Sequence, residues 1–211
     1  MERKFKKIRI AVLASGRGSN LAAIIEAAQS GKLDGEVVVV ISNKADAGAL
    51  NIARQYNIPT LHLSREQFST EEEFDTAFLR AFEKYQVDII ALAGYMKKLS
   101  AKIVRAYKNK ILNIHPALLP AFGGKGMYGL KVHQAVLDYG CKVTGVTVHI
   151  VDEEYDTGPP VLQECVPVYP EDTPESLAAR VLKVEHRLYP QALQLFAEGR
   201  IEVQGRKVIV K

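Results

Sequence analysis

Short apolar runs alternate with amphipathic segments along the first half of the chain. Residues 8–13 form an almost wholly apolar run, after which leucine, isoleucine and alanine recur at helical spacing from residue 21 to residue 28. The same alternation predicts further strands at 36–42, 60–63, 87–93 and 111–114, and further helices at 47–56, 75–85 and 100–107. Such alternation is typical of a parallel sheet with helices on both faces.

The pattern changes after residue 116. A loop rich in glycine and proline at 120–129 precedes a short helix and then two alternating segments that read as antiparallel strands. The expected elements are a helix at 132–139, strands at 143–150 and 161–168, a helix at 174–197 and a small hairpin at 201–210. We therefore expect an α/β fold in a single domain, 1–211. Its half 1–116 would be Rossmann-like with a mostly parallel sheet, and its half 117–211 would add antiparallel strands.

Composition and charge exclude several classes of protein. With 47% hydrophobic and 25% charged residues, the chain has the composition of an ordinary globule. Its apolar runs all fall short of the roughly 18 to 20 residues that cross a bilayer, so we expect neither a membrane partner nor a secretory signal. A net charge of +4 is too mild to predict nucleic-acid binding. Cys141 and Cys165 are too few for a disulfide framework, which favours a cytoplasmic location.

A glycine-containing loop, residues 15–20, lies between the first predicted strand and the first predicted helix. Backbone N–H groups and the helix dipole converge there, so Gly18, Ser19 and Asn20 are candidates to bind a phosphate. The dinucleotide-binding fingerprint is incomplete. Leu21 stands where its third glycine belongs, and the end of the second strand, residues 42–44, has no acidic residue. Because of Lys44, an NADP reductase remains one alternative to a phosphate-binding loop. A tight turn that binds no ligand is another.

Asn113 and His115 end the fifth predicted strand. Alternate residues of a strand project from the same face, so an amide and an imidazole are expected side by side. Ligands of open parallel sheets lie beyond the carboxyl ends of the strands, and this position favours a functional role over a packing histidine.

An acidic segment, residues 152–156, follows the first antiparallel strand. Such a charge run is usually a solvated loop. The Gly-Pro-Pro turn behind Asp156 would fix the backbone and hold its carboxylate steady beside a histidine. The remaining histidines show no metal-binding spacing, so we expect no metal.

Several motifs together resemble the phosphoribosylglycinamide formyltransferase family. They occur in that family's order over nearly the whole chain, and are IAVLASGRGSNL, ISNKADAGAL, ALAGYMKKLS, ILNIHPALLP, HIVDEEYDTGPPVLQE and VEHRLYP. The resemblance implies a folate-dependent enzyme of de novo purine synthesis. Such an enzyme moves the formyl group of 10-formyltetrahydrofolate to the amine of 5'-phosphoribosylglycinamide and leaves tetrahydrofolate.

The resemblance also implies roles for particular residues. Asn113, His115 and Asp156 match the catalytic trio, and Glu185 joins the phosphate loop in binding the nucleotide. The implied folate contacts are Met96, Lys97, Lys98, Leu99, Val151, Asp152, Glu153, Glu154 and Tyr155. Lys97 departs from the arginine of many members, Ala117 replaces a common serine, and the loop 122–129 is longer than in some relatives.

The implied chemistry is direct attack of the amine through a tetrahedral adduct. Asn113 and His115 are the candidate donors to its oxyanion, and Asp156 would favour the charged imidazole. Either Asp156 or His115 would take the amine proton. The alternatives are a formyltetrahydrofolate deformylase-like hydrolase and a non-catalytic nucleotide-binding module. The expected partners are small-molecule substrates, with the chain a monomer or a homodimer.

Overall fold

The computed structural model describes residues 7–211 and confirms the predicted α/β class. The chain divides into two compact units, Met1–Leu112 and Asn113–Lys211. The strands are β1 (Ile8–Leu13), β2 (Gly35–Ser42), β3 (Thr60–His62), β4 (Ile89–Leu92), β5 (Ile111–His115), β6 (Val143–Ile150), β7 (Pro160–Pro167), β8 (Ile201–Gln204) and β9 (Lys207–Val210). The α-helices are α1 (Ser19–Gln29), α2 (Gly48–Gln55), α3 (Glu71–Lys84), α4 (Ala101–Ala106), α5 (Leu130–Asp138) and α6 (Pro174–Ala197).

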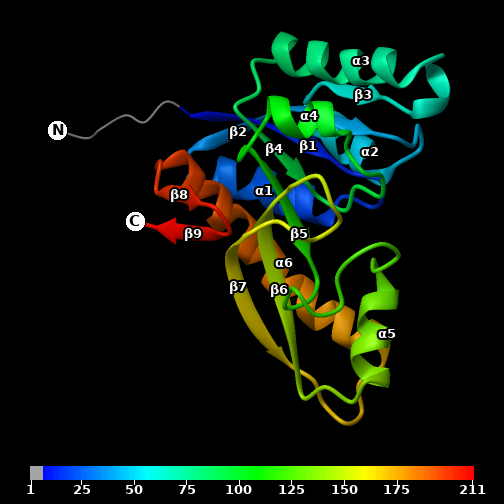
Figure 1. Cartoon of the computed structure of the whole chain (residues 1–211), viewed down its shortest axis with the longest axis vertical. Helices are drawn as coiled ribbons and strands as arrows, with labels where there is room; N and C mark the ends of the chain where they lie inside the picture. Colours follow the sequence, from blue (N-terminus) through cyan, green and yellow to red (C-terminus); the bar gives the residue numbers. More distant parts are fainter. Residues whose placement is uncertain (1–6) are drawn as a thin grey trace. The chain divides into compact units, whose positions relative to one another are not determined.

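The first unit is built on parallel strands in the order β3-β2-β1-β4. The strands β1 and β4 are buried along nearly their whole length, as their apolar sequences predict for a sheet covered on both faces. Figure 1 shows them running between α1 on one side and α3 and α4 on the other, which is the predicted arrangement. Parallel order brings the carboxyl ends of β1, β2 and β4 to one edge, where the loops after them meet.

The second unit contains the predicted antiparallel pair. Strands β6 and β7 pair from Val143 with Pro167 to His149 with Pro160, with an irregularity between Val148 and His149. The helix α6 packs on both of these strands and α5 packs on α6 (Figure 1). Strands β8 and β9 form the predicted terminal hairpin. The helix α6 begins where Thr173 and Pro174 predict it, because the Thr173 hydroxyl accepts the N–H of Ser176.

Two local features of the first unit differ from the sequence prediction. Helix α3 begins at Glu71, earlier than the predicted residue 75, because Thr70 and Glu73 form a reciprocal capping box. A 3₁₀ turn at Arg65–Gln67 was not predicted. The single domain, with its two halves meeting at residue 116, stays a prediction. The compact units of the structure divide a few residues earlier, so Asn113 and His115 belong to the second unit.

Candidate active site

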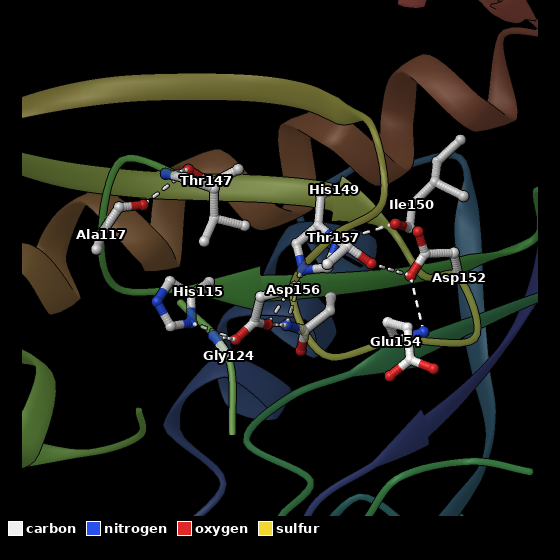
Figure 2. Close-up of polar contacts among 12 residues, drawn as sticks. His115, Ala117, Gly124, Thr147, His149, Ile150, Asp152, Glu154, Asp156 and Thr157 are labelled. Carbon is white, nitrogen blue, oxygen red and sulfur yellow. Dashed lines mark hydrogen bonds and ion pairs between the residues drawn. The ribbon is translucent and has the colours of Figure 1, made fainter. Parts of the chain in front are cut away.

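Polar side chains gather at the ends of β5 and β6 within the second unit (Figure 2). Asn113 and His115 alternate on β5, as predicted, and His149 lies near the end of β6. Asp156 reaches them from the loop between β6 and β7. The side chains of His115 and His149 are 4% and 2% exposed and that of Asp156 is 12% exposed, so their charges interact with little screening by water.

The amide of Asn113 joins two of these groups. Its Nδ2 lies 3.1 Å from Nε2 of His149 and 3.4 Å from Oδ1 of Asp156. An amide nitrogen carries two hydrogens, and each has an acceptor here. The contact with Asp156 is the longer and therefore the weaker of the two, so it is the one that gives way more easily to another acceptor.

His149 is held in one tautomer. Its Nδ1 lies 2.8 Å from the carbonyl oxygen of Ile150, which can only accept, so Nδ1 carries the proton. In the neutral ring Nε2 then has a lone pair, and this accepts the N–H of Asn113. The ring thereby fixes which way the Asn113 amide faces.

His115 faces a carbonyl with one nitrogen and a carboxylate with the other. Its Nε2 donates to the carbonyl oxygen of Phe122 at 2.8 Å, and its Nδ1 lies 3.6 Å from Oδ2 of Asp156. Burial lowers the pKa of His115 below its ordinary value, against the opposing effects of the Asp156 charge and the Phe122 carbonyl. The ring is therefore neutral at pH 7, and any proton it gains goes to Nδ1, beside the carboxylate.

Asp156 is held as a carboxylate. Burial acts to raise its pKa. The imidazoles of His149 and His115, when protonated, and the backbone N–H of Gly124 outweigh that effect and leave the pKa below its ordinary value. The Gly124 N–H donates to Oδ2 at 2.9 Å. The backbone of Asp156 is left-handed, with φ of 55°, a conformation that aspartate tolerates better than most residues.

The loop that carries Asp156 is held by hydrogen bonds to Asp152 before it and by close packing at Gly158 after it. Oδ1 of Asp152 accepts the Thr157 hydroxyl at 2.7 Å and the Glu154 N–H at 3.1 Å (Figure 2). Gly158 is required at the turn, because a Cβ there would lie 1.8 Å from the Ile150 carbonyl oxygen. Close packing at Gly158 thus constrains the turn behind Asp156, and the Asp152 carboxylate forms hydrogen bonds within the same loop.

A buried hydroxyl holds the chain after β5. Thr147, on β6, donates to the Ala117 carbonyl at 2.7 Å and accepts from the Leu119 N–H and from Gln163, each at 3.0 Å. These bonds fix the start of the segment that leads to Phe122 and Gly124, the two backbone partners of His115 and Asp156.

The predicted phosphate loop lies in the first unit. Gly18 precedes α1 with φ of 87°, and a Cβ there would lie 2.7 Å from Cα of Ala49. No side chain caps α1 and its first turn has no acidic residue, so neither a side-chain cap nor an acidic residue of that turn competes with an anion there. Ser19 is half-buried and Asn20 is buried.

The other predicted binding residues differ in exposure. Met96, Lys97 and Lys98 are exposed in the first unit, whereas Leu99 is buried. In the second unit, Val151 is half-buried, Glu153, Glu154 and Tyr155 are exposed, and Glu185 is buried on α6. Their assignment to folate or nucleotide stays a prediction.

His149 belongs to the cluster but is not among the candidate residues predicted from the sequence. It contacts both Asn113 and Asp156. The signal was available, because alternation along β6 places Thr147 and His149 on one face of a strand otherwise rich in valine.

Over residues 7–211, every helix is too short or too polar to cross a bilayer. Within the same described part of the chain, no three histidine, cysteine, aspartate or glutamate residues lie close enough together to hold a metal ion.

An amide, an imidazole and a carboxylate that meet beside the ends of two neighbouring strands are groups that can stabilise an oxyanion and move a proton, as the active site of a group-transfer enzyme requires. The chain belongs to the formyl transferase family, whose model matches residues 8–193. The predicted resemblance is thus confirmed, and with it the expectation of a folate-dependent formyltransferase.

Curated relatives from plants are similar over most of the chain. A chloroplastic phosphoribosylglycinamide formyltransferase of Arabidopsis thaliana is 44% identical over 198 residues, covering 93% of this chain and 68% of that protein. One of Vigna unguiculata is 43% identical over 196 residues, covering 93% of this chain and 63% of that protein. The chain therefore spans about two thirds of these relatives.

Solved structures share the fold. Glycinamide ribonucleotide transformylase 1 of Symbiobacterium toebii has a TM-score of 0.91 and 44% identity, with 97% of this chain and 94% of that chain covered. A formyltetrahydrofolate deformylase of Pseudomonas syringae has a TM-score of 0.87 at 28% identity, with 98% of this chain and 67% of that chain covered.

Proposed function

We propose that this chain transfers the formyl group of 10-formyltetrahydrofolate to the amine of 5'-phosphoribosylglycinamide, giving formyl-phosphoribosylglycinamide and tetrahydrofolate in purine synthesis. The observation that carries the proposal is the contact of Asn113, His115 and Asp156 within one cluster of a formyl transferase. The names of the plant and Symbiobacterium relatives favour the glycinamide nucleotide as acceptor.

The proposed reaction begins when the amine attacks the formyl carbon. The carbonyl oxygen becomes an oxyanion, and the amine nitrogen becomes positively charged. One N–H of Asn113 leaves its weaker contact with Asp156 and donates to the oxyanion, while His149 keeps the other N–H in place. The Asn113 donor is thus preorganised by a neighbour that takes no part in the chemistry.

The amine proton then has to reach the folate nitrogen. In the proposed path, Asp156 accepts it and passes it to Nδ1 of His115, which lies 3.6 Å from the carboxylate. The resulting imidazolium is stabilised by the carboxylate beside it. His115 returns the proton to the folate nitrogen as the carbon–nitrogen bond to folate breaks, so no charge is gained or lost overall.

The proposal also assigns residues to the two substrates. Gly18, Ser19 and Asn20 would bind the nucleotide phosphate through the N-terminus of α1, and Glu185 would bind the glycinamide part. The residues 96–99 and 151–155 would contact the folate. We propose small-molecule substrates only, no metal, a cytoplasmic location, and a monomer or homodimer.

The test follows tetrahydrofolate release by absorbance, with and without the glycinamide nucleotide. Release that requires the nucleotide supports the proposal. Release at the same rate without the nucleotide would instead identify a hydrolase, the activity named for the Pseudomonas structure. If no tetrahydrofolate is released under either condition, both formyl transfer and hydrolysis are excluded.

A further inference from the structure

In the first unit, the buried hydroxyl of Ser15 forms hydrogen bonds with the loops that follow β2 and β4. Ser15 is 4% exposed and follows β1 by two residues. Its Oγ donates to Oδ1 of Asn43 at 2.5 Å and accepts the backbone N–H of Met96 at 2.8 Å. The one hydroxyl proton and a lone pair are therefore both engaged, by residues that follow β2 and β4.

Backbone bonds reinforce the same junction. The N–H of Ser15 donates to the Gly94 carbonyl at 3.0 Å, and that of Ala14 donates to the Ile41 carbonyl at 3.0 Å. The loops after β1, β2 and β4 are thus joined around a single residue. All of these contacts lie within the unit Met1–Leu112.

The segments on either side of Ser15 are the ones proposed above to bind different substrates. Gly16 to Asn20 follow it directly and include the proposed phosphate loop, whereas residues 96–99 belong to the proposed folate contacts. Met96 is 46% exposed and is the first residue of that segment. Its backbone N–H has the Ser15 hydroxyl as its acceptor, so a shift of Ser15 changes the anchor of the folate segment.

We propose that Ser15 is a positioning residue that couples nucleotide binding to folate binding. Order in the phosphate loop fixes the Ser15 hydroxyl, and the fixed hydroxyl holds residues 96–99 in the conformation that receives folate. The inference rests on the proposed function, since the ligands of both segments are those proposed there. Coupling of this kind is reciprocal, so folate also tightens nucleotide binding by the same factor.

The test measures the coupling in a complex that cannot react. Tetrahydrofolate, which carries no formyl group, is titrated by calorimetry into the protein with and without saturating 5'-phosphoribosylglycinamide. For the native chain we expect the nucleotide to tighten tetrahydrofolate binding by about 5- to 150-fold, the usual range of such coupling. In Ser15→Ala we expect less than about 2-fold coupling, although each ligand alone still binds, because the backbone bonds of Ser15 remain.

Two further variants separate coupling from general damage. Asn43→Ala removes one partner of the hydroxyl and keeps the bond to Met96, so its coupling should fall between those of the native chain and Ser15→Ala. Ser100→Ala is the matched control. It removes a serine hydroxyl just after the same segment, one that accepts the N–H of Ile103 in α4, and should keep the native coupling.

The outcomes are distinct for the two proposals. Equal coupling in the native chain and Ser15→Ala, or no coupling in a native chain that binds both ligands, overturns the role of Ser15 and leaves the proposed function standing. A native chain that binds neither ligand overturns the proposed function as well. If Ser15→Ala shows no cooperative thermal transition, its coupling cannot be interpreted and Asn43→Ala becomes the deciding variant. Native coupling in Asn43→Ala then overturns the inference.

Discussion

The loop at residues 15–20 and the polar cluster around Asp156 differ in what supplies their hydrogen bonds. The loop offers the backbone N–H groups at the start of α1, and Gly18 permits the turn that exposes them. The cluster instead uses buried side chains from β5, β6 and a later loop. A backbone site is damaged by adding atoms to a glycine, whereas a side-chain site is damaged by removing one charge or one ring.

The largest effect is expected from Asp156→Asn. The variant keeps the size of the side chain but removes the negative charge beside His115, so turnover should fall by roughly 10²- to 10⁴-fold. Nucleotide affinity, measured by calorimetry, should change little, because in the proposal Gly18, Ser19 and Asn20 bind the phosphate. Glu171→Gln removes an exposed charge and serves as the control. Near-native turnover in Asp156→Asn would remove this carboxylate from the mechanism.

His149→Ala should have the next largest effect. Without the ring, Asn113 loses the acceptor that fixes its amide, and a misplaced oxyanion donor should lower turnover by about 10- to 10²-fold. The acidic limb of the pH–rate profile should move to higher pH, since His149 helps to hold the pKa of Asp156 below its ordinary value. His62→Ala, on β3 of the first unit, is the control for loss of a histidine. Native turnover in His149→Ala would show that this ring does not position the Asn113 donor.

Gly18→Ala should act mainly on the first unit. From sequence, a bulky residue at this position is expected chiefly to weaken nucleotide binding. The structure adds a folding cost, because the backbone is left-handed and the new Cβ would meet Cα of Ala49 at 2.7 Å. The free energy of unfolding, from denaturant titration, should fall by about 1–3 kcal/mol.

Gly16→Ala is the matched comparison in the same loop. A Cβ at that position has no atom within 4 Å, so the loss of stability should stay within about 0.5 kcal/mol. An equal loss in both variants would show that close packing at Gly18 does not limit the loop.

Local patterns account for what the sequence predicted correctly. Asn113 and His115 were paired because positions two apart on a strand share a face. The order of strand, loop and helix around residues 15–20 was predicted because its residues are contiguous, and the binding of phosphate there stays a prediction. The start of α3 was placed late because the Thr70–Glu73 capping box was not used, although it is present in the sequence.

Contacts between distant residues limited the rest. Asn113 and His149 are 36 residues apart, and only the pairing of β5 with β6 brings them together. Likewise, the Ser15 hydroxyl meets the Met96 N–H across 81 residues. No local periodicity carries either contact, so both needed the structure.

The smallest expected effect is a loss of stability in mild acid, carried by buried histidines of the second unit. His133, on α5, is 4% exposed, and burial lowers its pKa, with the charge of His115 acting in the same direction. The pKa of His115 is also lowered by burial. Both rings gain a proton more readily in the unfolded chain, so the unfolded state binds more protons and the free energy of unfolding falls as pH drops below about 6.5.

This window differs from that of the carboxylates. Asp156 has a pKa below its ordinary value, so its contribution is lost only below about pH 3.8. His133→Gln should therefore flatten the decline that begins below about pH 6.5 and leave the decline below about pH 3.8 unchanged, as measured by urea titration at each pH. The same slope in His133→Gln and the native chain would mean that His133 is not the ring that resists protonation. Gly16→Ala is the control, because Gly16 belongs to the first unit and His133 to the second. Its free energy of unfolding should fall with pH as steeply as that of the native chain. The comparison therefore separates the sensitivity of the second unit to charge from the sensitivity of the first unit to added atoms.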